Sequence, residues 1–137
     1  MIKDRTELAR IQTEWDGVCK LREKIQRHLF IGGARGFSHD LADYAHNLPF
    51  LQACGVLNDA LKQLRDEDHF PGKGRQTLGA LVGAAKDKLH WVDYSAVETI
   101  VSERNDLAHR ARVLPRKDCW NHISTIEAEL RNWSIIP

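Results

Sequence analysis

Apolar residues recur at spacings of three and four along most of this chain, and that spacing limits what it can fold into. The clearest run extends from Thr6 to about Phe30, with charged side chains on its other faces. A repeat of 3.6 residues brings such positions onto one side of an α-helix, whereas a strand needs a period of two. No strand-type alternation occurs in the sequence, so we predict an all-α protein. The apolar positions of the first run are Leu8, Ile11, Trp15, Val18, Leu21, Ile25 and Leu29.

A second helical region, residues 37–68, contains a proline. Pro49 has no backbone N–H, and its ring clashes with the preceding turn of a helix. We therefore expect a break or kink near Asn47–Leu48, with a shorter piece before it and a firm helix after it. Pro71, Gly72 and Gly74 then mark a loop over residues 66–75.

Three more helices are expected in the second half of the chain. Thr77 is placed to cap a short helix over residues 78–89, where many small residues favour close approach by another helix. Ser95-x-x-Glu98 is a capping box that starts a helix running to about Val113. A final amphipathic helix covers residues 117–133, with Pro115 or Asp118 at its start.

Together these segments predict a bundle of four main helices with one or two short ones, in a single domain of residues 1–137. The chain is 42% hydrophobic and 28% charged, which is typical of a globular protein. Its net charge of +1 does not by itself indicate a nucleic-acid or membrane partner. Without an apolar leader or a run of about 18 apolar residues, we expect a cytoplasmic location and no membrane partner.

The cysteines and most histidines show no spacing that indicates a metal site. Cys19, Cys54 and Cys119 are far apart and lie in apolar segments, so we interpret them as reduced, buried thiols. The histidines form neither His-x3-His nor His-Glu-x-x-His. We therefore predict no metal and no other cofactor.

Residues 95–112 have the least ordinary distribution of polarity in the chain. At about 100° per residue on a helix, their apolar side chains fall on one arc that we expect to face the core. Arg104 lies near the middle of that arc, where an unpaired charge is costly. A polar stripe runs along the flank of the arc. The arc contains Val97, Ile100, Val101, Leu107, Ala108 and Ala111, and the stripe contains Glu98, Ser102, Asn105, His109 and Arg112.

The chemistry of this segment suits a phosphate-containing ligand. A histidine moves protons near neutral pH, and an arginine stabilises phosphate charge. Arg104 and His109 lie about 140° apart around an ideal helix, so one ligand reaches both most easily across a cleft formed with a second copy. Alternatively, Arg104 extends its charge to the surface or pairs with an acid at the edge of the core, and His109 is an ordinary surface residue.

The run Arg104-Asn105-Asp106-Leu107-Ala108-His109 resembles the Arg-x4-6-His motif of the HEPN superfamily, including the frequent asparagine after the arginine. Its position on the penultimate long helix of a small all-α chain also matches. The resemblance implies a helical bundle that dimerises and places two motifs across a cleft. Many members are metal-independent endoribonucleases that act as toxins or in defence against phage, whereas others bind nucleotides or have lost catalysis.

The resemblance implies that Arg104 and His109 are the catalytic pair and that Asn105 is an auxiliary polar residue. It also implies a homodimer, an RNA substrate and, for a toxin, a cognate antitoxin protein. In the subgroup paired with nucleotidyltransferase antitoxins, a tyrosine follows the histidine by two residues, and here that residue is Ala111. The alternative function is a non-catalytic helical module that binds a nucleotide, RNA or a protein partner.

A basic cluster follows the motif and is the predicted phosphate-binding rim. It comprises Arg110, Arg112, Arg116 and Lys117. The same cations also complement the dipole at a helix C-terminus, which is an equally good structural explanation. Two glycine-rich basic loops, residues 32–36 and 72–75, are secondary candidates, although turn chemistry explains them better.

Overall fold

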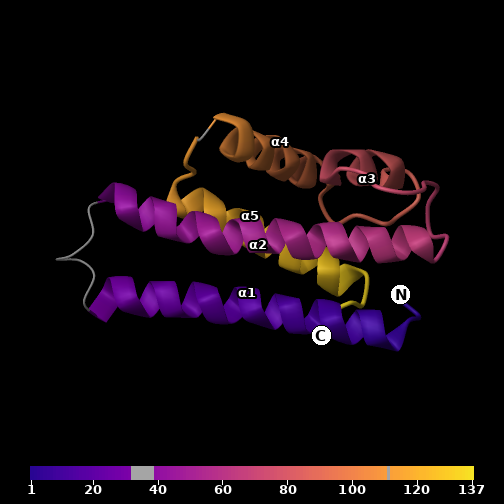
Figure 1. The fold of residues 1–137 in the computed structure, drawn as a ribbon, viewed down its shortest axis with the longest axis horizontal. Coiled ribbons are helices and arrows are strands. Elements are labelled where there is room, and N and C mark those ends of the chain that lie inside the picture. The colour runs from indigo at the N-terminus through magenta and orange to yellow at the C-terminus, as the bar shows by residue number, and fades with distance from the viewer. Residues whose placement is uncertain (32–38, 111) are drawn as a thin grey trace.

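The computed structural model describes residues 1–31, 39–110 and 112–137, without the side chains of residues 28–31 and 39–43. Within these ranges the protein is all-helical and contains no strand, which confirms the prediction of an all-α protein (Figure 1). Four helices are long and one is short. They are α1 (Arg5–Ile31), α2 (His39–Asp66), α3 (Leu78–Ala85), α4 (Tyr94–Arg110) and α5 (Arg116–Asn132).

Helix α2 occupies the centre of the fold. It packs against α1 and against α5, and its C-terminal half also contacts α3 (Figure 1). Helix α4 packs on α5 and on α3, so it lies in the layer farthest from α1. The core forms where α1, α2 and α5 meet. Cys54 and Cys119 are buried thiols within it, as predicted, whereas the prediction of burial is wrong for Cys19, which is half-buried. Its largest fully buried side chains include Ile11, Phe50, Leu57, Leu61, Leu64, Ile123, Ile126, Leu130 and Trp133.

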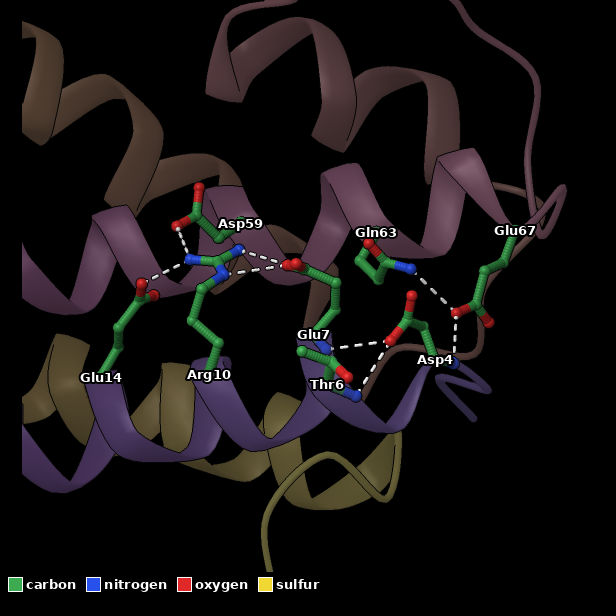
Figure 2. Close-up of polar contacts among 8 residues, drawn as sticks. All are labelled: Asp4, Thr6, Glu7, Arg10, Glu14, Asp59, Gln63 and Glu67. Carbon is green, nitrogen blue, oxygen red and sulfur yellow. Dashed lines mark hydrogen bonds and ion pairs between the residues drawn. The ribbon is translucent and has the colours of Figure 1, made fainter.

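The start of α1 is fixed by carboxylates (Figure 2). Asp4 caps the helix, because one of its side-chain oxygens accepts from the N–H groups of Thr6 and Glu7 at 2.9 and 3.1 Å. Glu67, the first residue after α2, accepts from the N–H groups of Lys3 and Asp4 at 2.7 and 3.0 Å. Helix α1 therefore begins one residue before the predicted Thr6, and its first residues are fastened to α2.

The predicted break at Pro49 is wrong, because α2 continues through this residue. Pro49 is buried in a helix that packs against both α1 and α5, and that packing compensates for the missing hydrogen bond. Two residues earlier, the Asn47 amide group bonds to both backbone groups of Leu114, at 2.9 and 3.0 Å. This buried contact joins the N-terminal half of α2 to the segment between α4 and α5.

Helix α3 begins as predicted and ends four residues early. Thr77 caps it by accepting from the N–H of Ala80 at 3.2 Å. The helix ends at Ala85, after which the chain makes short turns through residue 89. The expected close approach by another helix is found at Gly79, where an added Cβ would lie 3.3 Å from Cγ1 of Val101 on α4.

Helix α4 is capped by Asp93, so the predicted capping box of Ser95 and Glu98 is wrong. The Asp93 carboxylate accepts from the N–H of Ala96 at 3.0 Å, which places the cap two residues earlier. Glu129 of α5 fixes this connector, because its fully buried carboxylate accepts from the N–H groups of Val92 and Asp93 at 2.9–3.0 Å. Helix α5 begins after Pro115 and matches its predicted bounds to within one residue.

Candidate functional site

The six residues of the motif lie in the last two turns of α4, and this half of the helix contributes little to the core. Val97 and Ile100 are fully buried in the first half, whereas Leu107 is half-buried and Ala108 is exposed. The prediction that Ala108 faces the core is therefore wrong, and Ala111 lies outside the described residues. The C-terminal end of α4 stands apart from α2 in Figure 1, which explains the loss of burial.

Arg104 lies between the core and the solvent. Its side chain is half-buried, and Nη1 lies 3.4 Å from Oδ1 of Asn105, which is a long hydrogen bond. Within residues 1–31, 39–110 and 112–137, no carboxylate lies within 4.0 Å of the guanidinium among the side chains described. The alternative that Arg104 pairs with an acid at the edge of the core therefore has no partner in this part of the chain.

The positive charge of Arg104 also acts on the Cys54 thiol of α2. Burial raises the pKa of the Cys54 thiol to about 12, and the nearby Arg104 charge opposes that rise without overcoming it. Cys54 therefore stays protonated at neutral pH and is not a nucleophile. The positive charge of Arg104 remains available for an external anion.

Asn105 and His109 are exposed and lie four residues apart, on the same side of α4. Arg110 is also exposed, and its Nε lies 4.0 Å from Oδ1 of Asp106, at the outer limit of an ion pair. Such an exposed pair holds its partners weakly. The structure thus presents Asn105, His109 and Arg110 to solvent beside the half-buried Arg104.

The predicted phosphate-binding residues continue this surface beyond the end of α4. Arg112 is exposed in the connector between α4 and α5, and Arg116 and Lys117 are exposed in the first turn of α5. From Arg104 to Lys117 the sequence has five cations and one carboxylate, that of Asp106. This segment, residues 104–117, is called the cationic segment below.

A cavity of about 510 Å³ lies between α4 and the start of α5. Arg112 is among its lining residues, whereas Arg104, Asn105 and His109 are not. The three predicted catalytic side chains therefore do not meet in this cavity of a single chain. The remaining lining residues are Thr99, Ser102, Glu103, Asp106, Val113, Leu114, Pro115 and Asp118.

A contact between Glu103 and His122 was missed by sequence reasoning. The Glu103 carboxylate binds Nε2 of the mostly buried His122 and so joins α4 to α5 next to the motif. The His122 ring also packs 5.5 Å from the ring of Phe50 on α2. The two residues are 19 positions apart, so only the packing of α4 on α5 brings them together, and no local spacing indicates the contact.

The glycine-rich loop at residues 72–75 has a structural explanation. Gly74 has φ of +70°, a conformation that favours glycine, and its carbonyl accepts from Nη1 of the buried Arg65 at 2.7 Å. Arg65 also bonds to Gln76 at 2.9 Å, so it organises the whole turn. The other glycine-rich loop, residues 32–36, lies outside the described residues.

The described residues contain no group of three or more His, Cys, Asp or Glu side chains arranged to hold a metal ion. None of the helices, so far as they are described, combines the length and apolar character needed to cross a membrane. No protein-family model, curated protein or solved structure matches this chain.

Proposed function

We propose that this protein is a HEPN-type, metal-independent endoribonuclease that acts as a homodimer. The observation that carries the proposal is the surface at the end of α4. Exposed His109 and Asn105 lie there beside Arg104, whose guanidinium has no carboxylate within 4.0 Å in the described part of the chain. A proton-transfer group and a cation available for an anion are the minimum that phosphodiester cleavage requires.

The mechanism that these residues support uses the RNA's own 2′-hydroxyl as nucleophile. His109 takes the proton from that hydroxyl, or protonates the leaving 5′-oxygen, and Arg104 stabilises charge on the pentacoordinate phosphorus. Asn105 holds a phosphate oxygen or orients His109. The P–O5′ bond breaks as the P–O2′ bond forms, which leaves a 2′,3′-cyclic phosphate and a free 5′-hydroxyl.

A second copy of α4 completes the proposed site. Arg104 and His109 are five residues apart, which on a helix is a rotation of about 140° and a rise of about 7.5 Å along the helix axis. Within one chain, the two side chains therefore do not easily bind the same phosphate. Two antiparallel motifs across a two-fold axis place Arg104 of one subunit opposite His109 of the other. The basic residues Arg110, Arg112, Arg116 and Lys117 then form the rim that attracts RNA.

The biological role that we propose is that of a cytoplasmic toxin or defence nuclease, with a cognate antitoxin protein as a partner. The second candidate function is a non-catalytic module that binds a nucleotide, RNA or a protein. One observation favours this second function: the cavity beside α4 is lined by Arg112 and not by Arg104 or His109. Both functions use the same helix and differ in whether His109 transfers a proton.

The test is RNA cleavage in excess chelator. We expect the wild-type protein to cleave RNA and to leave 2′,3′-cyclic phosphate ends, and we expect His109→Ala to lose at least about 100-fold in rate. The matched control is His90→Ala, which removes an exposed histidine outside the motif and should leave the rate unchanged. Equal trace cleavage by all three proteins would exclude the enzyme, and RNA binding retained without cleavage would support the second function.

A further inference from the structure

A row of exposed apolar side chains follows one face of α2. Tyr44, Leu48 and Leu51 are 58%, 57% and 39% exposed, and they account for three of the five large apolar side chains that the described residues leave exposed. Their spacing of four and three residues places them on one side of the helix, opposite the side that packs on α5. Gly55 and Asp59 continue the same line, and we call these five residues the α2 stripe.

Beside the α2 stripe lies an open groove of about 460 Å³ between α1 and α2. Gly17 of α1 and Gly55 of α2 both line it, and a Cβ added at either glycine would meet nothing within 4 Å. Glycine in the interior of a helix costs roughly 0.5–1 kcal/mol relative to alanine. These glycines leave room at the surface, where the described part of the chain places nothing.

We infer that the α2 stripe is a dimer interface, with the α2 helices of two copies packed antiparallel about a two-fold axis between residues 51 and 52. About that axis, residue i faces residue 103 − i of the second copy. Leu48 then faces Gly55, Leu51 faces Gln52, and Tyr44 faces Asp59. Each large apolar side chain meets a small or polar one, so the helices approach closely without a clash.

The pattern favours a second copy over an unrelated partner because it is self-complementary. In a two-fold contact the same surface of both copies meets in reversed order, so large side chains have to fall opposite small or polar ones. The α2 stripe together with the adjacent Gln52 meets this condition. The polar ends match as well. One oxygen of Asp59 accepts from Arg10 at 3.1 Å, and the other points away from Arg10 in Figure 2, where the hydroxyl of the second copy's Tyr44 can donate to it.

This interface is separate from the proposed site on α4. The α2 stripe lies on the side of α2 turned away from α5, whereas α4 packs on α5 and α3. The inference therefore stands whether or not the protein cleaves RNA. Because each contact has its own two-fold axis, a protein that forms both assembles into more than two copies.

The first test is the mass of the protein in solution, measured by light scattering over a concentration series. One chain is 15.7 kDa. We expect Leu48→Glu to halve the mass of the wild-type assembly, because it places a carboxylate in the apolar contact with Gly55 of the second copy, one helical turn from that copy's Asp59 carboxylate. Leu48 is exposed, so the variant should fold, which circular dichroism will check. Ser124→Glu is the matched control, since it adds the same charge at an exposed position of α5 and should leave the mass unchanged.

The second test locates the axis by cross-linking, in a Cys19→Ser background that removes the half-buried thiol. With a short bis-maleimide, Gln52→Cys should give covalent dimers, because the two copies of residue 52 are offset by only about 2 Å along the axes of the paired α2 helices. Asp66→Cys is exposed on the same face, yet its two copies would lie about 40 Å apart and should not cross-link. A wild-type monomer, a mass unaffected by Leu48→Glu, or cross-linking at both positions would overturn the inference.

Discussion

Charged side chains differ in how closely they are hydrogen-bonded at two regions of this molecule. Around the N-terminus and the start of α4, carboxylates are directed at backbone N–H groups: Asp4 and Glu67 hold the start of α1, and Asp93 and Glu129 hold the start of α4. At the other end of α4, two arginines of the cationic segment make long contacts, 3.4 Å for Arg104 and 4.0 Å for Arg110.

This difference in hydrogen bonding indicates which charged residues stabilise the fold and which are available to bind a ligand. A carboxylate that accepts several backbone N–H bonds is stabilised by the fold and stabilises it in return, so its removal should be felt in unfolding. A guanidinium held only by a weak, exposed contact contributes little to folding, and its charge remains for a ligand. The carboxylates should therefore control stability, and the cationic segment should control binding.

The largest expected effect on stability is that of Glu129→Gln. The fully buried carboxylate accepts from both Val92 and Asp93, and an amide would turn an N–H group toward these donors. We expect a loss of about 2 kcal/mol in the free energy of unfolding, measured by urea denaturation. Glu127→Gln is the control on the same helix and removes only a half-exposed pair with Arg131, so it should cost less than about 0.5 kcal/mol.

Glu67→Gln should have a smaller effect that depends on pH. Partial burial alone would raise the pKa of Glu67, but bonds from Asp4, Gln63 and Lys3 outweigh it and lower the pKa to about 2, from an ordinary value of 4.5. A depressed pKa adds stability above the unfolded value, and this contribution is lost as pH falls from about 5 toward 2.

We therefore expect Glu67→Gln to cost about 1 kcal/mol at pH 7 and much less near pH 2, in urea titrations at both pH values. The Glu127→Gln variant should show the same small difference at both. A cost for Glu67→Gln that does not shrink in acid would mean that the carboxylate is not what holds the N-terminus.

Much of the fold followed from the spacing of apolar residues, because burial of one helix face dominates local preferences. The bounds of α5 were predicted closely for this reason, and the Thr77 cap was predicted from the local hydrogen bond that a threonine side chain accepts at a helix start. The errors arose where a tertiary contact overrode a local rule. Pro49 stays within α2 because both sides of that helix are packed, and Asp93 caps α4 because Glu129 fixes the connector before it.

The candidate site could be predicted only in part. The motif spacing selected the helix and the candidate residues, and the structure places Asn105 and His109 on its exposed face. The contact between Glu103 and His122 depends on how α4 lies on α5, which no local pattern encodes. The loss of burial at Ala108 likewise reflects how far the C-terminal end of α4 stands from α2, so the sequence of α4 alone did not reveal it.

The smallest expected effect on stability is that of Arg110→Ala combined with Arg112→Ala. Both side chains are exposed, so the free energy of unfolding should change by less than about 0.5 kcal/mol. Binding of single-stranded RNA should weaken, and the slope of log affinity against log salt should fall by about 1.4, since each lost phosphate contact on a single strand removes about 0.7.

The control for this prediction is Lys20→Ala combined with Arg27→Ala, which removes two exposed cations of α1 that form surface pairs with Asp16 and Glu23. Both double variants lower the net charge by two, so a general effect of charge would change their salt slopes equally. A slope that falls only for the Arg110 and Arg112 variant, without loss of stability, would place RNA contacts in the cationic segment. Equal salt slopes for the two double variants would mean that Arg110 and Arg112 make no specific RNA contact and serve only to complement the dipole at the C-terminus of α4.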